Sequence, residues 1–505
     1  MEPHAQPGRG LRMVHVVYAV LIYCAIVAAA WPRRTYDTWW HLATGRYIVQ
    51  EGYVPHTDPF TYTREGQPWI THEWLWELAM YLLYSRWGFA GLIALKVTVC
   101  AAAGLLLTWL CLRRGATPLV VVLVGALGIF AARPLFNVRP QVVSLLMFVV
   151  MLCLIQLARE GRERWLWLAP VVMAVWANLH GGFIFGPAII ALFGLCMVPR
   201  WLRQGREGEP LSPTPAVVGG ALALCCLACL ANPNGLAGAI YPLAYLTGEH
   251  SYTKGIVSEY DSPQFGEAMW AFLGVYVLLI VAAFALSRRR AELFDLAVCL
   301  VFVFIALRWE RNVALMAFAT APILSLHLTD FARDRLGIGA RAADTSTRTQ
   351  IAHALMIVIL LISAGAALPT AVGRVGEVFA EDFPVQALQV VRERNLQGHM
   401  FNTYHWGGYL IWHLWPEQKV FIDGRADVMG RELMMDWIRA HKLEPGWREV
   451  LDRYDVQWVI ITVHSPLCRA LRISPDFELI HADDNAELFV RRPAATPAIT
   501  EGGER

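Results

Sequence analysis

The feature that most constrains this chain is a series of long apolar runs. They are roughly 18 to 22 residues long, and an apolar helix of about 20 residues can cross the hydrocarbon core of a bilayer. Charged residues make up only 17% of the 505 residues, against about 25% in soluble domains. We therefore predict a polytopic α-helical membrane protein with about 11 transmembrane helices. The predicted spans are 12–31, 89–110, 118–136, 141–158, 165–181, 183–199, 215–232, 267–286, 292–308, 311–328 and 351–371.

Charge sets further limits on the class of protein. The formal net charge is +2, so the chain has no excess of positive charge to bind a nucleic acid by counterion release, and we expect no nucleic-acid partner. The first apolar run ends in small residues, as signal peptides do. At about 19 residues it is longer than a signal h-region of about 7 to 15, and we interpret it as a retained membrane anchor.

Basic residues in the short loops predict the orientation, because Lys and Arg are retained in the cytoplasm. With a cytoplasmic N-terminus, every cytoplasmic loop is basic, and only Arg33 and Arg34 oppose this arrangement. The first loop (32–88), the loop 233–266 and the tail after Val372 are then extracytoplasmic. The basic loop residues are Arg113, Arg114, Arg159, Arg162, Arg164, Arg200, Arg203, Arg206, Arg288 to Arg290, Arg333, Arg335, Arg341 and Arg348.

The tail has a different character from the rest of the chain. Residues 1–372 form the predicted membrane domain, including the loop 32–88, and residues 373–495 an extracytoplasmic soluble α/β domain; 496–505 are predicted to be disordered. Apolar patterning and turn residues predict the elements of the α/β domain. They are helices Pro384–Asn395 and Gly446–Tyr454, strands Lys419–Asp423 and Gln457–Thr462, and a strand pair Phe477–Ala482 and Ala486–Arg491.

Ionisable side chains gather at the predicted extracytoplasmic ends of the spans. The cytoplasmic loops carry mostly Arg with Glu, whereas the outer ends combine carboxylates, imidazoles and guanidinium groups. Ionisable groups at a membrane boundary cost free energy unless they are paired or hydrated. Their convergence on one rim therefore predicts a functional site.

Asp37 is the leading catalytic candidate. It lies shortly after the first span, and on a helix that begins here Asp37 and His41 share a face at positions i and i+4. A carboxylate at the interface could act as general base for an acceptor hydroxyl or ligate a divalent cation. The structural alternative is that Asp37 caps the helix and that His41 is a solvated interfacial residue.

The rest of the first loop holds three further candidates. Asp58 and Glu73 are candidate catalytic acids, and His72 is a candidate substrate-binding residue. Alternatively, Asp58 orders the turn Pro55–Phe60, and Glu73 complements the dipole of an amphipathic interfacial helix that opens with Thr71-His72-Glu73-Trp74, where Glu73 lies in the first turn. The pair His72-Glu73 is too short for a metal motif, because neighbours on a helix do not face each other.

The remaining candidates suit an anionic substrate. Arginine binds phosphate through a planar fork of donors, and Arg pairs bracket two short outer turns, although snorkelling to lipid headgroups is an alternative for each. Lys96, within the second span, could reach the interface or pair with a buried phosphate. His180, in a tight Gly turn, either contributes to the site or caps a helix, and Glu259, in the loop 233–266, is a candidate second acid or metal ligand. The arginines of the two outer turns are Arg133, Arg139, Arg308 and Arg311.

Three strings carry a resemblance to a known superfamily: Asp37-Thr38-Trp39-Trp40-His41-Leu42-Ala43-Thr44-Gly45-Arg46, Pro55-His56-Thr57-Asp58-Pro59-Phe60 and Phe421-Ile422-Asp423-Gly424-Arg425. With the order of spans, the long first loop and the external tail, they resemble the GT-C superfamily of membrane glycosyltransferases, and within it a bacterial group of unassigned substrate. By this resemblance, Asp37 matches the first-loop aspartate that serves as base or metal ligand, and Asp58 and Glu259 match more loosely.

Two positions depart from better-known members of the superfamily. Asp37 is followed by Thr38, where protein mannosyltransferases have a second acid. Trp39-Trp40 is followed by His41, so the Trp-Trp-Asp motif of oligosaccharyltransferases is absent. The resemblance therefore implies a reaction class rather than a particular substrate.

The resemblance implies inverting transfer of a sugar from a polyprenyl-phosphate donor to a glycan, lipid or protein acceptor, at the outer face of a bacterial inner (plasma) membrane. Membrane lipids are the expected surroundings, and a divalent cation is possible but not required. Two alternatives remain open. One is a transporter or flippase of a lipid-linked glycan, although such proteins tend to carry charges near the bilayer midplane and two related halves. The other is a non-catalytic envelope assembly protein whose tail binds partners.

Overall fold

The chain folds into two compact units. The computed structural model describes residues 13–30, 35–132, 136–247, 261–267, 270–337 and 346–493. Unit 1 comprises Met1–Thr35, Ile48–Val54 and Ile70–Gly376, and unit 2 comprises Tyr36–Tyr47, Pro55–Trp69 and Glu377–Arg505. The division after Gly376 lies close to the domain boundary predicted after residue 372. However, unit 2 also takes two segments of the first loop, which the sequence assigned to the membrane domain. The tail 496–505 lies outside the described residues.

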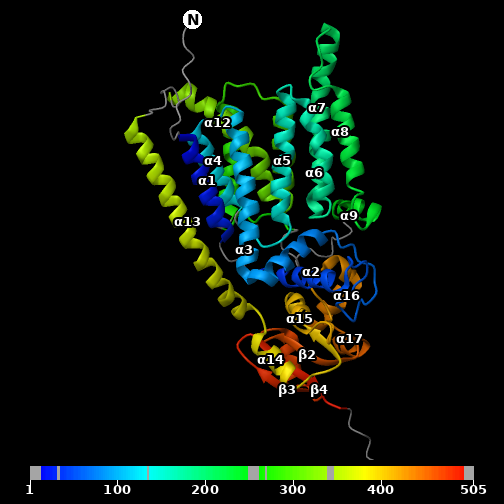
Figure 1. Ribbon diagram of the computed structural model, residues 1–505. Helices are drawn as coiled ribbons and strands as arrows, with labels where there is room; N and C mark the ends of the chain where they lie inside the picture. Colours follow the sequence, from blue (N-terminus) through cyan, green and yellow to red (C-terminus); the bar gives the residue numbers. More distant parts are fainter. Residues whose placement is uncertain are drawn as a thin grey trace, which may run out of the picture. The chain divides into compact units, whose positions relative to one another are not determined.

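Unit 1 is α-helical, and each predicted apolar run coincides with a helix. Helices α3, α5, α6, α7 and α8 run alongside one another (Figure 1). The helices are α1 (Met13–Ala30), α3 (Trp74–Arg113), α4 (Pro118–Ala132), α5 (Gln141–Arg159), α6 (Ala169–Trp176), α7 (Phe185–Glu207), α8 (Pro215–Ala228), α9 (Gly235–Thr247), α10 (Ala271–Leu286), α11 (Leu293–Arg308), α12 (Val313–Leu336) and α13 (Thr347–Asp382), with 3₁₀ segments Glu163–Leu168, Gly181–Ile184 and Glu310–Asn312.

Six helical segments of the described residues are long and apolar enough to cross a membrane. They are Met13–Ala30, Trp74–Arg113, Gln141–Arg159, Gly181–Glu207, Glu310–Leu336 and Thr347–Arg374, and α4, α8 and α10 are shorter apolar helices. The protein is therefore a multi-pass α-helical membrane protein, as predicted, while the number of crossings remains a prediction.

Helix α3 changes direction at one glycine. Gly88 has φ 58° and ψ −144°, which is not helical, and it divides the element into a segment that starts at Trp74 and a segment that ends at Arg113. Glycine adopts a positive φ without the steric cost of a Cβ. The break matches the predicted change from an amphipathic helix to a membrane span at residue 89.

Helices α12 and α13 show the two environments of an apolar helix. In α12, 89% of the apolar window is buried, and the helix packs against α4, α10 and α11, whereas in α13 only 11% is buried. The Tyr276 hydroxyl of α10 donates to the Ala317 carbonyl of α12 at 3.0 Å. A helix that is apolar all round is either a core helix or a helix that faces lipid. We therefore interpret α12 as the core of unit 1 and α13 as a lipid-facing helix.

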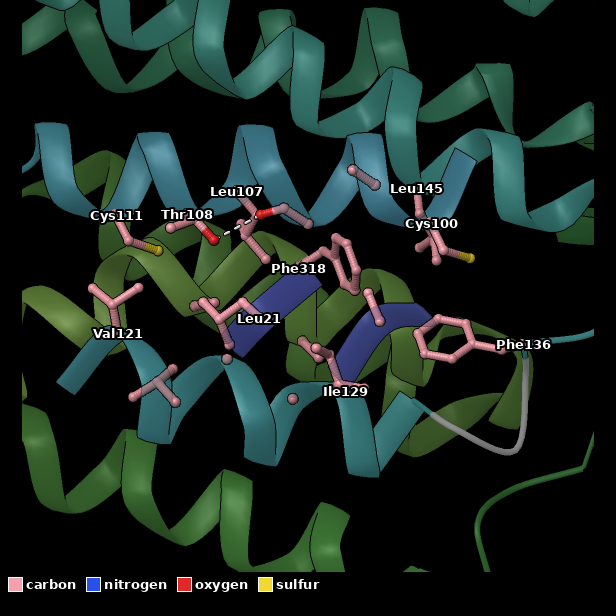
Figure 2. Close-up of a pocket in the computed structure, with 18 of the residues that line it drawn as sticks. Leu21, Cys100, Leu107, Thr108, Cys111, Val121, Ile129, Phe136, Leu145 and Phe318 are labelled. Atoms are coloured by element: carbon pink, nitrogen blue, oxygen red, sulfur yellow. Dashed lines mark hydrogen bonds between the residues drawn. The ribbon is translucent and has the colours of Figure 1, made fainter. Parts of the chain in front are cut away.

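An apolar cavity lies among α1, α3, α4, α5 and α12 (Figure 2). The Thr108 hydroxyl in its wall donates to the Gly104 carbonyl at 2.7 Å, so this polar group is satisfied within its own helix. Such a lining suits hydrocarbon rather than a sugar or a phosphate. The labelled lining residues are Leu21, Cys100, Leu107, Thr108, Cys111, Val121, Ile129, Phe136, Leu145 and Phe318.

Unit 2 contains a mixed four-stranded sheet of order β1-β2-β4-β3. Strand β1 (His399–Asn402) is parallel to β2 (Val456–Thr462), whereas β4 (Ala486–Arg491) is antiparallel to β2 and to β3 (Phe477–Ala482). The apolar strand and the terminal strand pair expected from the sequence are present. The other elements are the start of α2 (Thr38–Glu51), α14 (Val385–Glu393), a 3₁₀ turn Tyr404–Trp406, α15 (Gly407–Leu414), α16 (Ala426–Lys442), α17 (Trp447–Arg453) and α18 (Pro466–Arg472).

The predicted strand Lys419–Asp423 is wrong. This segment pairs with the first loop instead of joining the sheet, through a single parallel bridge between Thr61 and Val420. The Val420 amide donates to the Phe60 carbonyl at 3.1 Å, and the Tyr62 amide donates to the Val420 carbonyl at 3.2 Å. The three consecutive apolar residues Val420, Phe421 and Ile422 are all buried, and they therefore reflect burial beside the first loop rather than a strand of the sheet.

A buried ion network joins the first-loop segment of unit 2 to its C-terminal part. Asp58, Asp423 and Arg425 are at most 2% exposed. Arg425 Nη2 lies 2.8 Å from Asp58 Oδ1 and 2.5 Å from Asp423 Oδ2, and Nε donates to Asp423 Oδ1 at 2.9 Å. The guanidinium also lies 4.4 Å from the ring centroid of Trp69. Burial alone would lower the pKa of Arg425, but the two carboxylates outweigh it and raise the pKa above its ordinary value.

We expect the Arg425→Met variant to lose about 3–5 kcal/mol of unfolding free energy, because it leaves two buried carboxylates without their cation. Thermal unfolding of the protein in lipid nanodiscs measures the loss. The control is Lys419→Met, which removes an exposed ion pair with Glu65 and should cost at most about 1 kcal/mol. Equal, small losses of unfolding free energy in both variants would contradict a stabilising role for the Arg425 ion network.

Candidate functional site

Asp37 of unit 2 stands at the beginning of α2. It is half-buried and lies in the turn before Thr38, and its carbonyl accepts the His41 amide at 3.2 Å. This backbone bond is the first of the helix, as the sequence predicted. His41 is buried rather than solvated, with its ring 3.6 Å from that of Trp40.

Glycines of the C-terminal part bring the backbone close to Asp37. A Cβ at Gly424 would lie 2.6 Å from Asp37 Oδ1, and one at Gly408 would lie 3.0 Å from the Trp40 amide nitrogen. Gly424 stands between Asp423 and Arg425, so the ion network fixes the backbone against which the carboxylate rests. The sequence analysis singled out the string Ile422-Asp423-Gly424-Arg425, but its contact with Asp37 could not be predicted, because the two segments are far apart in the sequence.

His405 is a neighbour of Asp37 that the sequence analysis did not select. Its ring stacks on Tyr36 with centroids 4.7 Å apart. Burial lowers the pKa of His405 below its usual value, and the charge of Asp37 acts in the opposite direction. The carboxylate and the imidazole are therefore electrostatically coupled.

Asp58 is fully accounted for by structural contacts. Its carboxylate accepts the amides of Phe60 at 3.1 Å and Thr61 at 3.2 Å, and the Thr61 hydroxyl at 2.5 Å, in addition to Arg425. These contacts fit the turn-ordering alternative. A catalytic role for Asp58 stays a prediction that its burial does not favour.

Unit 1 brings together His72, Glu73 and His180. The two histidine Nε2 atoms lie 3.4 Å (His72) and 3.7 Å (His180) from Glu73 Oε1. The sequence predicted that His72 and Glu73 would not face each other, and this expectation is wrong because both lie in the turn before α3 rather than on the helix. Glu77, one turn into α3, has an oxygen within 4.8 Å of one of Glu73.

A hydrogen-bond network sets the orientation of His180. The Ser144 hydroxyl accepts Trp176 Nε1 at 2.7 Å and lies 2.7 Å from His180 Nδ1, to which the Gly182 amide also donates at 3.0 Å. Because Nδ1 is the acceptor, the proton of the neutral ring is on Nε2, facing Glu73. Ser144 lies within a predicted span, and nothing in the local sequence signals this role.

His72 has the opposite arrangement. Its Nδ1 lies 3.2 Å from the Ile70 carbonyl oxygen, which can only accept, so Nδ1 carries a proton. In the neutral ring, Nε2 then presents a lone pair beside Glu73 Oε1. A histidine held by a backbone carbonyl through one nitrogen, with the other turned to a carboxylate, is a typical arrangement for binding a cation.

The predicted cationic groups divide between those near this cluster and those elsewhere. Arg139 and Arg311 act electrostatically on His180 together with His72 and Glu73. Arg308 stacks over Trp309, with 5.0 Å to the ring centroid. Lys96 is buried within α3. Arg133 and Glu259 lie outside the described residues.

Comparison with known proteins tests the fold. No protein-family model matches the chain, and no curated protein matches it. Among solved structures, the oligosaccharyltransferase AglB from Archaeoglobus fulgidus, in complex with an inhibitory peptide and a dolichol-phosphate, matches with a TM-score of 0.51 and 12% identity, over 88% of this chain and 69% of that chain. The chain shares its fold with this oligosaccharyltransferase, as the predicted GT-C-like architecture implies. ArnT from Cupriavidus metallidurans, bound to undecaprenyl phosphate, matches with a TM-score of 0.47 and 14% identity, over 94% of this chain and 97% of that chain.

We expect Ser144→Ala to destabilise the protein by about 1–3 kcal/mol, because it leaves the buried Trp176 Nε1–H without its acceptor. The measurement is the shift in thermal unfolding of the purified protein. Ser85→Ala is the matched control, since the Ser85 hydroxyl is exposed and bonds only to the Leu82 carbonyl of its own helix. An unchanged unfolding temperature in Ser144→Ala would contradict the network.

Proposed function

We propose that this protein is a membrane glycosyltransferase that moves a sugar from a polyprenyl-phosphate donor to an acceptor on the extracytoplasmic side. The observation that carries the proposal is the position of Asp37, half-buried at the start of α2 and against the Gly424 backbone. The GT-C fold supports it, since AglB, which has this fold, is an oligosaccharyltransferase whose structure holds a dolichol-phosphate.

In this proposal Asp37 assists deprotonation of the acceptor hydroxyl. The acceptor oxygen attacks the anomeric carbon as the bond from that carbon to the phosphate oxygen breaks, and the electron pair leaves with the polyprenyl phosphate. Attack opposite to the leaving group inverts the anomeric configuration. Proton removal by a positioned side chain typically contributes about 10²- to 10⁴-fold in rate.

Cationic side chains of unit 1 are the proposed phosphate-binding groups. Negative charge develops on the departing phosphate, and fixed donors stabilise it in the transition state. Arg139 and Arg311 supply forked donors, and His180 presents Nε2–H because the Gly182 amide donates to its Nδ1. Arg308, Lys96 and Arg133 remain proposed contributors on their charge alone.

A divalent cation is compatible with the acidic groups of unit 1. Glu73 and Glu77 offer oxygen ligands within 4.8 Å of each other, and His72 offers Nε2 at 3.4 Å from Glu73. Carboxylate oxygens suit hard cations, and imidazole suits transition metals. When bound, such an ion would neutralise phosphate charge. Glu259 stays a further proposed acid.

The basic cytoplasmic loops are the basis for the proposed orientation, with the N-terminus in the cytoplasm and unit 2 outside a bacterial plasma membrane. The acceptor could be a glycan, a lipid or a protein. The apolar lining of the cavity in unit 1 does not favour transport of a glycan.

We expect Asp37→Asn to lower transfer at least 100-fold, because the neutral amide has no negative charge to assist deprotonation of the acceptor hydroxyl. Purified protein in lipid is incubated with labelled polyprenyl-phosphate and polyprenyl-pyrophosphate sugars, and release of the lipid phosphate or pyrophosphate is followed. The control Asp484→Asn makes the same chemical change in the exposed turn between β3 and β4 and should leave the rate unchanged.

Two outcomes would contradict the proposal. Full activity in a folded Asp37→Asn variant would remove Asp37 from the reaction. No release from any donor by the folded wild type would favour transport or an assembly role.

A further inference from the structure

His405 occupies an accessible position next to Asp37. It lies in the 3₁₀ turn Tyr404–Trp406, between β1 and α15, and is exposed although the surrounding protein desolvates its ring. Its stack on Tyr36, at 4.7 Å and an angle of 27°, attaches the imidazole to the segment that carries the carboxylate. The His405 ring is therefore open to solvent beside the segment that carries Asp37.

The neighbours of His405 hold its ring in place. The Tyr404 ring meets the His405 ring edge-on at 5.3 Å, and the Tyr404 hydroxyl donates to the Gly424 carbonyl at 3.3 Å. From α16, His441 also interacts electrostatically with His405. Within the described part of the chain, contacts and electrostatic interactions therefore place Asp37, Tyr36, Tyr404 and His441 around His405.

We propose that His405 is a second catalytic residue, which takes the proton of the acceptor hydroxyl while Asp37 stabilises the resulting imidazolium. This inference rests on the proposed glycosyl transfer. The acceptor O–H proton moves to the free ring nitrogen of His405, the new bond forms between the acceptor oxygen and the anomeric carbon, and the bond from that carbon to the phosphate oxygen breaks. The proton then passes to solvent through the exposed edge of the ring.

The chemistry of the two groups suits this division. Desolvation holds the pKa of His405 below its usual value of 6.5, so the ring is neutral near pH 7 and can accept a proton. Asp37 raises that pKa in part, which means that the protonated ring is stabilised by the carboxylate. A carboxylate alone, with an ordinary pKa of about 3.9, is a weaker base for a sugar hydroxyl at neutral pH.

We expect His405→Gln to lower the maximal transfer rate about 100-fold with little change in KM for the donor, because a glutamine cannot take up the proton. The wild-type rate should fall as the pH drops through the pKa of His405, below 6.5, and the variant should not show this fall in rate at acidic pH.

His464→Gln, at an exposed position of the same unit, is the matched control. It should keep the wild-type rate and the fall in rate at acidic pH. A wild-type rate and pH profile in His405→Gln, while Asp37→Asn is inactive, would overturn this inference and leave the proposed function standing.

A second measurement does not depend on activity. NMR titration of the ¹³C-labelled histidines of the full-length protein, with His405 assigned by comparison with His405→Gln, gives its pKa in the wild type and in Asp37→Asn. The pKa of His405 should fall when the carboxylate is removed, because Asp37 raises it in the wild type. An unchanged pKa would show that the two groups are not coupled and would overturn the inference, even if no donor is cleaved.

Discussion

The arrangement of unit 2 depends on one buried interaction, in which Arg425 is shared between Asp58 and Asp423. A guanidinium and two carboxylates that are almost fully desolvated stabilise one another through opposite charge and direct hydrogen bonds. Here Nε and Nη2 of Arg425 bind the two acids, and the Thr61 hydroxyl and backbone amides also donate to Asp58, while Nη1 of Arg425 has no hydrogen-bond partner among the described residues. The interaction therefore holds a first-loop segment against a chain segment more than 350 residues away in sequence.

The consequence of this interaction for function lies in the residue between Asp423 and Arg425. Gly424 has no side chain, and Asp37 Oδ1 occupies the space that a Cβ would take. The Gly424 carbonyl is also the acceptor for Tyr404, the neighbour of His405. One rigid turn thus sets the positions of a carboxylate and an imidazole that sequence separates widely. In unit 1, the Gly182 amide donates to His180 Nδ1 and so fixes the tautomer of that ring, while the Ser144 hydroxyl lies beside the same nitrogen.

The parts of this architecture that the sequence predicted are those with a local cause. Apolar runs located the helices of unit 1, and the span predicted to start at residue 89 marked the change from an interfacial helix, which the structure makes at Gly88. An apolar run located β2, and apolar residues on either side of a turn located β3 and β4. Strand β1 and helix α16 were not predicted, and the segment at Val420 was misassigned, because its partner is the first loop rather than the sheet.

The residues of the candidate site also divide into those with a local signal in the sequence and those that depend on distant segments. Asp37, His72, Glu73 and His180 could be selected because polar residues at span ends are unusual. Their partners could not, since Ser144, His405 and Arg425 act through contacts between distant segments. Asp58 shows the limit of such reasoning: a carboxylate in a turn gives no sign in sequence of the buried arginine that binds it.

The most direct test of this account is the rate of polyprenyl-phosphate release by Gly424→Ala. The added methyl group would lie 2.6 Å from Asp37 Oδ1, so it must displace the carboxylate while it leaves the ion network chemically intact. Gly205→Ala is the matched control, because a Cβ there meets nothing within 4 Å. The account predicts that Gly424→Ala folds with an intact Arg425 network and loses transfer by at least about 100-fold, whereas Gly205→Ala keeps it. Full transfer by Gly424→Ala would contradict the claim that Asp37, seated on this turn, carries the reaction.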